Sequence, residues 1–189
     1  VKTEDGIRTQ AQDPGKLEDP SLIIYHPVRR VGDVLVVTNG DQTDTIRDAL
    51  LAGGTFESAL WTRSFEPDAP NLTPRISGAV SANGSYTMSI LKSADAGGSA
   101  CIRHFFSYPP IPGVGHFLHT YNGDGNPLPS FTGEPKRVEI PADMKGCAEG
   151  IWNSLNPENR ISLYVRYTNL AQGGTEEILF NQYGEETEL

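Results

Sequence analysis

The sequence has few cysteines, no long apolar run and no excess of positive charge. Its two cysteines, Cys101 and Cys147, are too few for a disulfide framework and fit a reducing compartment. The longest apolar runs, such as Leu22–Tyr25 and Val34–Val37, are far too short to span a bilayer. A formal net charge of −9 argues against a cationic face for nucleic acid or anionic lipid. We therefore expect a cytoplasmic protein without nucleic-acid or membrane partners.

Sequence signatures of metal binding, phosphate loops and covalent catalysis are also missing. His116 and His119 fall in one predicted strand, where their imidazoles would point to opposite faces and would not share a metal ion. The sequence contains no Gly-x-Ser-x-Gly elbow and no glycine-rich phosphate loop. Cys101 lies within a predicted strand, where an inert thiol is usual. We expect neither a metal nor a cofactor.

The length and the order of the predicted elements indicate one layered domain. A chain of 189 residues can bury a core of two or more layers, and 20 glycines with 14 prolines predict long loops. The order is a hairpin, two helices, a meander of strands, one helix and two strands. Because strands and helices do not alternate, the sheets should be largely antiparallel, which predicts an α+β fold. The chain starts at Val1 without a methionine, so we expect this single domain, residues 1–189, to lack its N-terminal strand.

Local patterns set the expected boundaries. Strands are predicted at residues 7–12, 22–31, 34–38, 75–81, 86–92, 100–108, 116–121, 161–168 and 177–182. Helices are predicted at residues 43–51, 56–63 and 141–155, and polar loops at residues 65–74 and 122–135. Thr43 or Asp44 should cap the first helix, and Thr55 the second. The turns at Gly32-Asp33 and Asn83-Gly84 are typical of hairpins.

The strand Val34–Val37 is followed by an unusually dense polar stretch, residues 39–44, with the sequence Asn-Gly-Asp-Gln-Thr-Asp. A turn and a helix cap would use three of these residues and leave residues 41–43 unexplained. Backbone N–H groups at such a junction can bind an anion, but the two aspartates would repel a phosphate. The stretch therefore suits neutral polar groups, such as ribose hydroxyls or a carboxamide.

A second candidate is the loop 65–74, "FEPDAPNLTP", which its prolines stiffen. Glu66 and Asp68 lie two positions apart in this loop, and Arg75 begins the next strand. Two interpretations remain open. The charges form a surface ion-pair cluster, or Glu66 is a proton acceptor whose pKa is raised in a pocket that Arg75 keeps electrically balanced.

Two tyrosines have equally open roles. Tyr25 falls in an apolar segment just before His26, where a core tyrosine with its hydroxyl bonded at the rim is the usual finding. Tyr121, Asn122 and Asp124 lie in "TYNGDGNPLPSF", residues 120–131. An aromatic ring, an amide and a carboxylate suit a sugar or a base, yet a loop rich in turn residues has the same composition.

The segments "DPSLIIYHPVRRVGDVLVVTNGDQTDTI" and "NLTPRISGAV" resemble the IMP cyclohydrolase family. The family pattern is Asn/Asp-Pro, an apolar segment with Tyr, Arg-x-x-Gly-Asp, and Ser/Thr-Asn-Gly-x-x-Thr-Asp-Thr-Ile. A glutamate-bearing loop and Asn-x-Thr-Pro-Arg-Ile follow. The resemblance covers residues 19–92. Family members begin with a strand and an arginine-rich segment before the position of Val1, which strengthens the expectation of a missing strand.

The resemblance implies a four-layer αββα sandwich like that of N-terminal-nucleophile hydrolases, in a homo-oligomer. It implies closure of 5-formamidoimidazole-4-carboxamide ribonucleotide to IMP with loss of water, in purine biosynthesis and without a cofactor. Tyr25 and Glu66 match the catalytic positions. The candidate substrate-binding residues are Asn39, Gly40, Asp41, Thr43, Arg75, Tyr121 and Asn122. Arg75, with Arg29 or Arg30, would offset the nucleotide phosphate.

Two other functions remain open. A purine-nucleotide-binding protein without catalytic activity would use the same loops. An amide hydrolase of the N-terminal-nucleophile type is disfavoured, because Val1 has no nucleophilic side chain.

Overall fold

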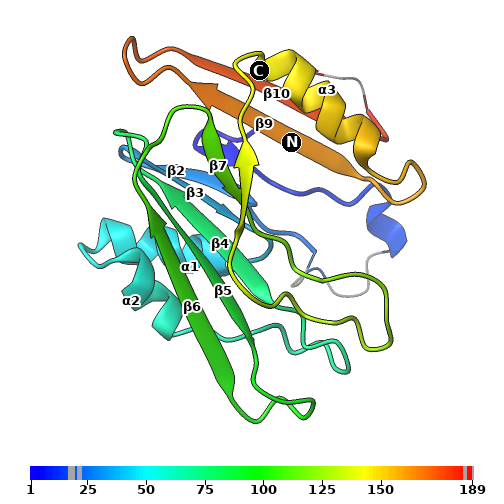
Figure 1. The fold of residues 1–189 in the computed structure, drawn as a ribbon. Coiled ribbons are helices and arrows are strands. Elements are labelled where there is room, and N and C mark those ends of the chain that lie inside the picture. Colours follow the sequence, from blue (N-terminus) through cyan, green and yellow to red (C-terminus); the bar gives the residue numbers. More distant parts are fainter. Residues whose placement is uncertain (17–19, 21–22, 185–186, 189) are drawn as a thin grey trace. The chain divides into compact units, whose positions relative to one another are not determined.

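The computed structural model describes residues 1–16, 20, 23–184 and 187–188. The chain forms two compact units. The first unit comprises residues 1–110 and 116–136, and the second comprises residues 111–115 and 137–189. Figure 1 shows the elements of both.

The first unit is built on a six-stranded sheet in which every strand pairs antiparallel with its neighbour in sequence. Its strands, in spatial order, are β1 (Gly6–Ile7), β2 (Val28–Val31), β3 (Val34–Thr38), β4 (Arg75–Val80), β5 (Tyr86–Ser93) and β6 (Cys101–Tyr108). Gly32 and Gly84, in the predicted hairpin turns, have φ of 56° and 82°, a conformation that glycine adopts without strain. The sheet is therefore a simple meander interrupted once, between β3 and β4.

Two helices form that interruption and cover one face of the sheet (Figure 1). They are α1 (Gln42–Leu51) and α2 (Phe56–Trp61). The core between them and the sheet consists of Val36, Ile46, Phe56, Ala59, Leu60 and Leu91. Thr55 caps α2 as predicted, since its side chain accepts a hydrogen bond from the Ser58 N–H and the Ser58 hydroxyl accepts one from the Thr55 N–H.

The opposite face of this sheet has its own core. Ile90, next to Leu91 on β5, points away from the helices because side chains alternate along a strand. It packs against Leu118 and Phe131, from the segment that follows β6. Both faces of the sheet are thus buried, which leaves the strand ends as the places where polar groups gather.

The second unit contains a three-stranded antiparallel sheet in the order β11-β10-β9, against which one helix packs (Figure 1). The elements are α3 (Met144–Ser154), β9 (Ser162–Thr168), β10 (Thr175–Asn181) and β11 (Thr187–Glu188). Ala148 of α3 is buried with Ile178 and Phe180 of β10. A two-stranded sheet, β7 (Val114–Phe117) with β8 (Lys136–Glu139), marks where the chain passes between the units, and a short 3₁₀ helix spans Pro14–Lys16.

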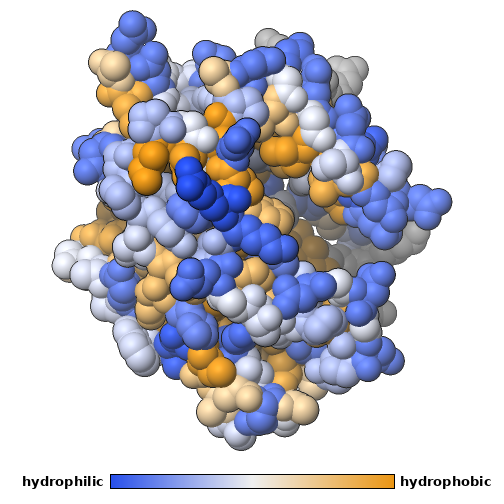
Figure 2. All heavy atoms as spheres, viewed as in Figure 1, coloured by the Kyte–Doolittle hydropathy of each residue, from blue (hydrophilic) through white to orange (hydrophobic). Residues whose placement is uncertain are grey.

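On the face shown in Figure 2, hydrophilic residues predominate and hydrophobic residues form small areas between them. Isolated exposed apolar residues are normal on folded proteins. Within the described ranges, no helix is both long enough and apolar enough to cross a bilayer.

The predicted α+β class with mostly antiparallel sheets is confirmed, but the first two predicted strands are largely wrong. The strand expected at residues 7–12 has only Ile7 in β1, and residues 8–12 form no strand. The strand expected at residues 22–31 begins only at Val28, and Leu22 lies outside the described residues. The N–H groups of Ile23 and Ile24 both bond to the Pro20 carbonyl, which makes a turn. Tyr25 instead bonds through its N–H to the Thr9 hydroxyl at 2.9 Å. Local turn bonds therefore prevail over the apolar pattern, and Tyr25 lies in a bend.

The predicted caps of α1 are also wrong. The helix begins at Gln42 with Asp41 at the N-cap, and no side-chain capping bond from Asp41 is found among the described residues. The Thr43 hydroxyl instead bonds to the Gly40 carbonyl at 3.0 Å. The Asp44 carboxylate accepts a 2.7 Å hydrogen bond from Arg29. Thr43 is thus engaged by the preceding turn and Asp44 by an arginine of β2.

Three further boundaries differ from the prediction. The strand expected at residues 116–121 ends at Phe117, since Leu118 packs on the first sheet and the His119 ring bonds to the Tyr121 carbonyl at 2.7 Å. The helix expected from Pro141 begins at Met144. Strand β8 was not predicted, because four residues with three charges carry no apolar alternation.

The buried core predicts a large difference between two leucines. Leu60 has no exposed surface, whereas Leu51 at the end of α1 is 63% exposed. Leu60→Ala should lower the free energy of unfolding by about 2–5 kcal/mol, because it removes transfer energy and leaves a cavity. The control Leu51→Ala should change it by less than about 0.5 kcal/mol. Urea denaturation measures both, and equal losses would contradict the assigned core.

Candidate functional site

The polar stretch after β3 is a turn closed by its own hydroxyls. The Thr38 hydroxyl donates to the Gly40 carbonyl at 2.7 Å and accepts from the Gly40 N–H at 3.1 Å. The Thr43 hydroxyl bonds to the same carbonyl at 3.0 Å and lies 2.5 Å from the Thr38 hydroxyl. Both threonines are buried. The predicted binding residue Thr43 therefore has its hydroxyl engaged within the protein.

The Asn39 side chain joins this turn to the start of β4. Its Nδ2 donates to the Pro74 carbonyl at 2.9 Å, and its Oδ1 accepts from the Ile76 N–H at 2.9 Å. Oδ1 also accepts from Gln42 Nε2 at 3.1 Å. Gln42 is fully buried, and its Nε2 makes a further 3.2 Å bond to the Ile76 carbonyl. The two amides thus fix the turn against the neighbouring strand.

A buried arginine lies at the centre of the site. Arg75 is 4% exposed and opens β4. Its Nη1 lies 2.7 Å from Asp41 Oδ1, 2.8 Å from Gln42 Oε1 and 3.4 Å from Glu66 Oε1. A second guanidinium, that of Arg63, lies 2.5 Å from the same Asp41 oxygen. Two arginines and two carboxylates therefore meet at one end of the sheet.

Burial would raise the pKa of Asp41, but hydrogen bonds and positive charge from Arg63 and Arg75 hold it below its ordinary value. Asp41 is thus ionised and accepts bonds from both guanidinium groups.

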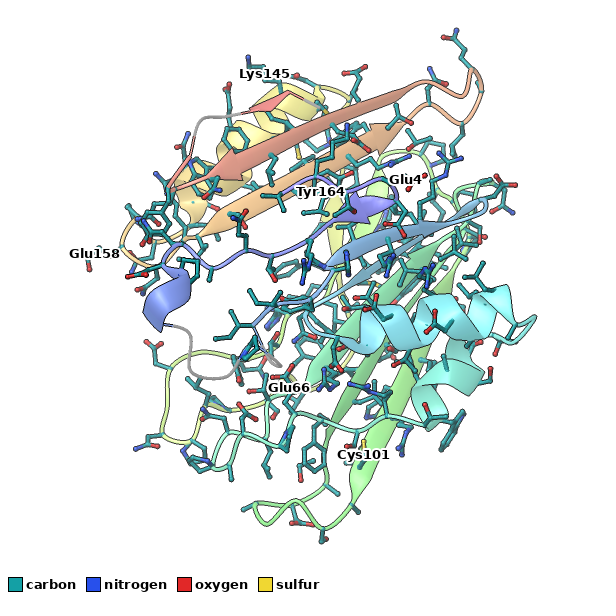
Figure 3. The ribbon with its side chains drawn as sticks, turned by 180° about the vertical axis from the view of Figure 1, so that it is seen from behind. Glu4, Glu66, Cys101, Lys145, Glu158 and Tyr164 are labelled. Carbon is teal, nitrogen blue, oxygen red and sulfur yellow. The ribbon has the colours of Figure 1, made fainter. Side chains whose placement is uncertain are left out.

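The pKa of Glu66 is shifted in the opposite direction from that of Asp41. Glu66 is 8% exposed on the loop between α2 and β4, where its N–H bonds to the Thr73 carbonyl at 2.9 Å. Figure 3 shows its place at the end of the six-stranded sheet. Burial raises the pKa of Glu66; Arg75 and Arg63 oppose this, and the negative charges of Asp68 and Asp41 add to it. The net result is a carboxylate that binds a proton more readily than an exposed glutamate.

Tyr25 lies within the electrostatic field of that carboxylate. Burial raises the pKa of the Tyr25 phenol, and the negative charge of Glu66 raises it further. These two residues, predicted as catalytic, are therefore electrostatically coupled although they come from separate segments of the chain.

The two polar loops are connected as well. The Tyr121 hydroxyl lies 2.5 Å from the Thr73 hydroxyl, which donates in turn to the Asp68 carboxylate. The Leu128 N–H bonds to the Asn71 side chain at 3.1 Å. Tyr121 therefore reaches the loop that carries Glu66.

The remaining candidates are less central. Exposed Asn122 bonds through its side chain to the Thr132 hydroxyl at 3.1 Å, within its own loop. Arg29 is paired with Asp5 and Asp44, at 2.7 Å from each. Arg30 is exposed. In the part of the chain that the structure describes, no group of three or more His, Cys, Asp or Glu side chains is arranged to hold a metal ion.

Sequence reasoning missed two members of the site. Gln42 belonged to the unexplained polar stretch, but its role depends on Arg75, which lies far along the sequence. Arg63 follows α2 and showed no signal beyond its charge, because its partner Asp41 precedes the helix pair. Contacts of this range are set by how the helices pack on the sheet.

Comparisons with known proteins agree with the resemblance found in the sequence. The sequence model of a family described as IMP cyclohydrolase-like protein matches residues 1–174. An IMP cyclohydrolase of the archaeon Methanococcus maripaludis is 32% identical over 90 residues. That match covers 46% of this chain and 44% of the archaeal protein, so the chain spans less than half of this relative.

The close packing at Gly40 gives a test of the site. A Cβ at this buried glycine would lie 2.6 Å from Arg75 Nη1 and from Gln42 Oε1, and 3.0 Å from Glu66 Oε1. Gly40→Ala should therefore lower the free energy of unfolding by about 1–3 kcal/mol, the usual effect of overpacking. In the control Gly150→Ala, the added Cβ meets nothing within 4 Å, and the helix should gain up to about 1 kcal/mol. Chemical denaturation of both variants measures the free energy of unfolding. An unchanged value in Gly40→Ala would contradict the described packing.

Proposed function

Since the chain belongs to the family of IMP cyclohydrolase-like proteins, we propose that it is a cyclohydrolase that forms IMP. The substrate is 5-formamidoimidazole-4-carboxamide ribonucleotide, and the ring closes with loss of one water. The name of the archaeal relative supports the proposal. The observation that carries it in this structure is the buried Glu66 carboxylate, with its raised pKa, beside the buried Arg75.

The reaction requires the protein to position the substrate and to transfer protons. The carboxamide nitrogen and the formyl carbon are attached to the same imidazole, so the substrate itself supplies most of the proximity. Well-oriented intramolecular reactions reach effective molarities of roughly 10⁵–10⁸ M. An enzyme has to select the reactive rotamer of the formamide and move two protons, which needs no metal and no covalent intermediate.

In this proposal Glu66 accepts a proton from the carboxamide nitrogen as that nitrogen bonds to the formyl carbon. Its raised pKa brings it nearer to the operating pH, where a general base is most effective. Tyr25 keeps its proton, because its pKa is raised, and donates a hydrogen bond to the formyl oxygen as negative charge develops there. That oxygen then takes up the proton held by Glu66 and the proton that the formamide nitrogen loses, and it leaves as water as the C=N bond forms.

The substrate-binding roles follow from which polar groups are already engaged. The side chains of Asn39 and Thr43 are bonded within the turn, so they act by holding its backbone in place. Gly40 lets the backbone approach Arg75 and Glu66 closely; its N–H and carbonyl are bonded to the Thr38 and Thr43 hydroxyls, so it acts by leaving space at the site.

The second loop and the basic residues complete the proposed binding site. Tyr121, linked to the Glu66 loop through Thr73, would face the base or ribose, with Asn122 at the exposed edge. Arg75 balances the acidic groups. Exposed Arg30 is the better candidate of the two β2 arginines for the phosphate, because Arg29 is engaged by two aspartates.

The proposal includes the finer expectations of the family. The family resemblance implies a four-layer αββα sandwich within a single domain. The protein would act as a homo-oligomer in purine biosynthesis in the cytoplasm, with a nucleotide as its small-molecule ligand.

Conservative changes at the two catalytic candidates test the reaction. Tyr25→Phe and Glu66→Gln should each lower kcat at least about tenfold, the usual scale for such groups, while IMP affinity changes little. Ring closure is followed by absorbance, and IMP binding by calorimetry. The exposed residues Tyr183 and Glu158 provide the matched controls Tyr183→Phe and Glu158→Gln, which should leave kcat unchanged. IMP binding without any turnover by the unmodified protein would favour the non-catalytic alternative.

The raised pKa of Glu66 predicts how activity depends on pH. A base must be deprotonated, so kcat/KM should fall as the pH drops through the pKa of Glu66. Because this pKa is raised, the fall should lie above about 4.3, the value of an ordinary glutamate. The substrate phosphate also titrates, near pH 6, but it does so equally in all variants. A pH profile in which Glu66→Gln keeps the same acidic limb would contradict the assigned role.

A further inference from the structure

The Arg75 guanidinium is shared unequally between two carboxylates. Its Nη1 lies 2.7 Å from Asp41 Oδ1, a normal hydrogen-bond distance, but 3.4 Å from Glu66 Oε1. Arg63 also bonds to Asp41, at 2.5 Å. Asp41 therefore receives two guanidinium groups, and the more deeply buried Glu66 has only the longer contact.

We propose that Asp41 is a positioning residue that holds Arg75 away from Glu66 and thereby keeps Glu66 available as the base. The inference rests on the proposed ring closure, and it assigns Asp41 a role other than substrate binding. A carboxylate in a bidentate pair with arginine would be a weak base, because the pair stabilises its ionised form.

The position of Arg75 is fixed from several sides. Gln42 Oε1 accepts from Arg75 at 2.8 Å. The Gln42 amide cannot turn round, because its Nε2 donates to Asn39 Oδ1 at 3.1 Å and to the Ile76 carbonyl at 3.2 Å. Gly40 packs against the same guanidinium without a side chain. Arg75 is thus held in the turn after β3, on the side of Asp41.

Among the described residues, the charged groups that shift the pKa of Glu66 are Asp41 at the start of α1, Arg63 after α2, Asp68 in its own loop and Arg75 on β4. The charge of Glu66 in turn raises the pKa of Tyr25, from the segment before β2. The charge of Asp41 itself raises the pKa of Glu66, and the charge of Arg75 lowers it. Removing the Asp41 charge would lower the pKa of Glu66 in two ways. The repulsion between the two carboxylates disappears, and Arg75 becomes free to pair with Glu66.

The test is Asp41→Asn, with Asp48→Asn as the control of equal charge change on the same helix. The Asp48 side chain is 68% exposed and paired with its neighbour Arg47. In Asp41→Asn the acidic limb of kcat/KM should move down by about 1 pH unit, the scale of one nearby charge. Loss of basicity should lower kcat about threefold or more, with KM changed less than about twofold. Asp48→Asn should leave kcat, KM and the acidic limb of the profile as they are in the unmodified protein.

A titration of the glutamate side-chain carboxyl carbons by NMR gives a readout that needs no turnover. Glu66→Gln identifies the Glu66 signal. The midpoint of that signal should fall in Asp41→Asn and stay unchanged in Asp48→Asn.

A second variant moves the same signal in the opposite direction. Arg63→Gln removes a positive charge that lowers the pKa of Glu66 and leaves Arg75 as the guanidinium partner of Asp41. The Glu66 midpoint should therefore rise. This variant also tests the inference if Asp41→Asn does not fold.

The outcomes separate the two proposals. If the unmodified protein does not close the ring, the proposed function fails, while the NMR midpoints still decide the coupling of Asp41 to Glu66. If the ring closes, and Asp41→Asn raises KM with the acidic limb and the Glu66 midpoint unchanged, the inference is overturned and Asp41 is a substrate ligand. A Glu66 midpoint that does not rise in Arg63→Gln overturns it equally.

Discussion

The site depends on the burial of one permanent positive charge, that of Arg75. A guanidinium with almost no exposed surface has to be compensated by carboxylates and by hydrogen-bond acceptors. Here Asp41 and Gln42 provide the close contacts and Glu66 a longer one. Because these groups come from the turn after β3 and from the loop before β4, Arg75 holds both segments in place.

The architecture explains why this charge is found at a strand end. Both faces of the six-stranded sheet carry apolar cores, and the buried charged residues Glu66 and Arg75 lie at one end of it. The helix pair α1 and α2 connects β3 to β4, and the chain leaves and re-enters the sheet at the same end. The turn 38–43 and the loop 65–74 therefore lie beside each other. That placement brings the buried Glu66 and Arg75 to the polar turn, which is the arrangement on which the proposed ring closure rests.

Much of the local structure was predictable, because short-range signals decide it. The β2–β3 hairpin, the cap at Thr55 and the core residues of α2 follow from turn chemistry and helical spacing. The errors fall where a residue bonds to a partner other than the one that the local pattern predicts. Tyr25 lies in a bend because its backbone bonds to Thr9, and Thr43 does not cap α1 because its hydroxyl closes the preceding turn. A single sequence does not contain those competing partners in readable form.

The sequence by itself determined the class of the fold, the family and which segments are candidates for a functional site. Turn residues, prolines and a long specific motif act over a few positions and can be read directly. Only the tertiary structure decided which polar groups are engaged and which remain available for a substrate. Burial and the unequal distances from Arg75 to Asp41 and Glu66 give these two carboxylates opposite pKa shifts. The physical reason is that desolvation and Coulomb interactions depend on where the chain packs, and no local pattern records that.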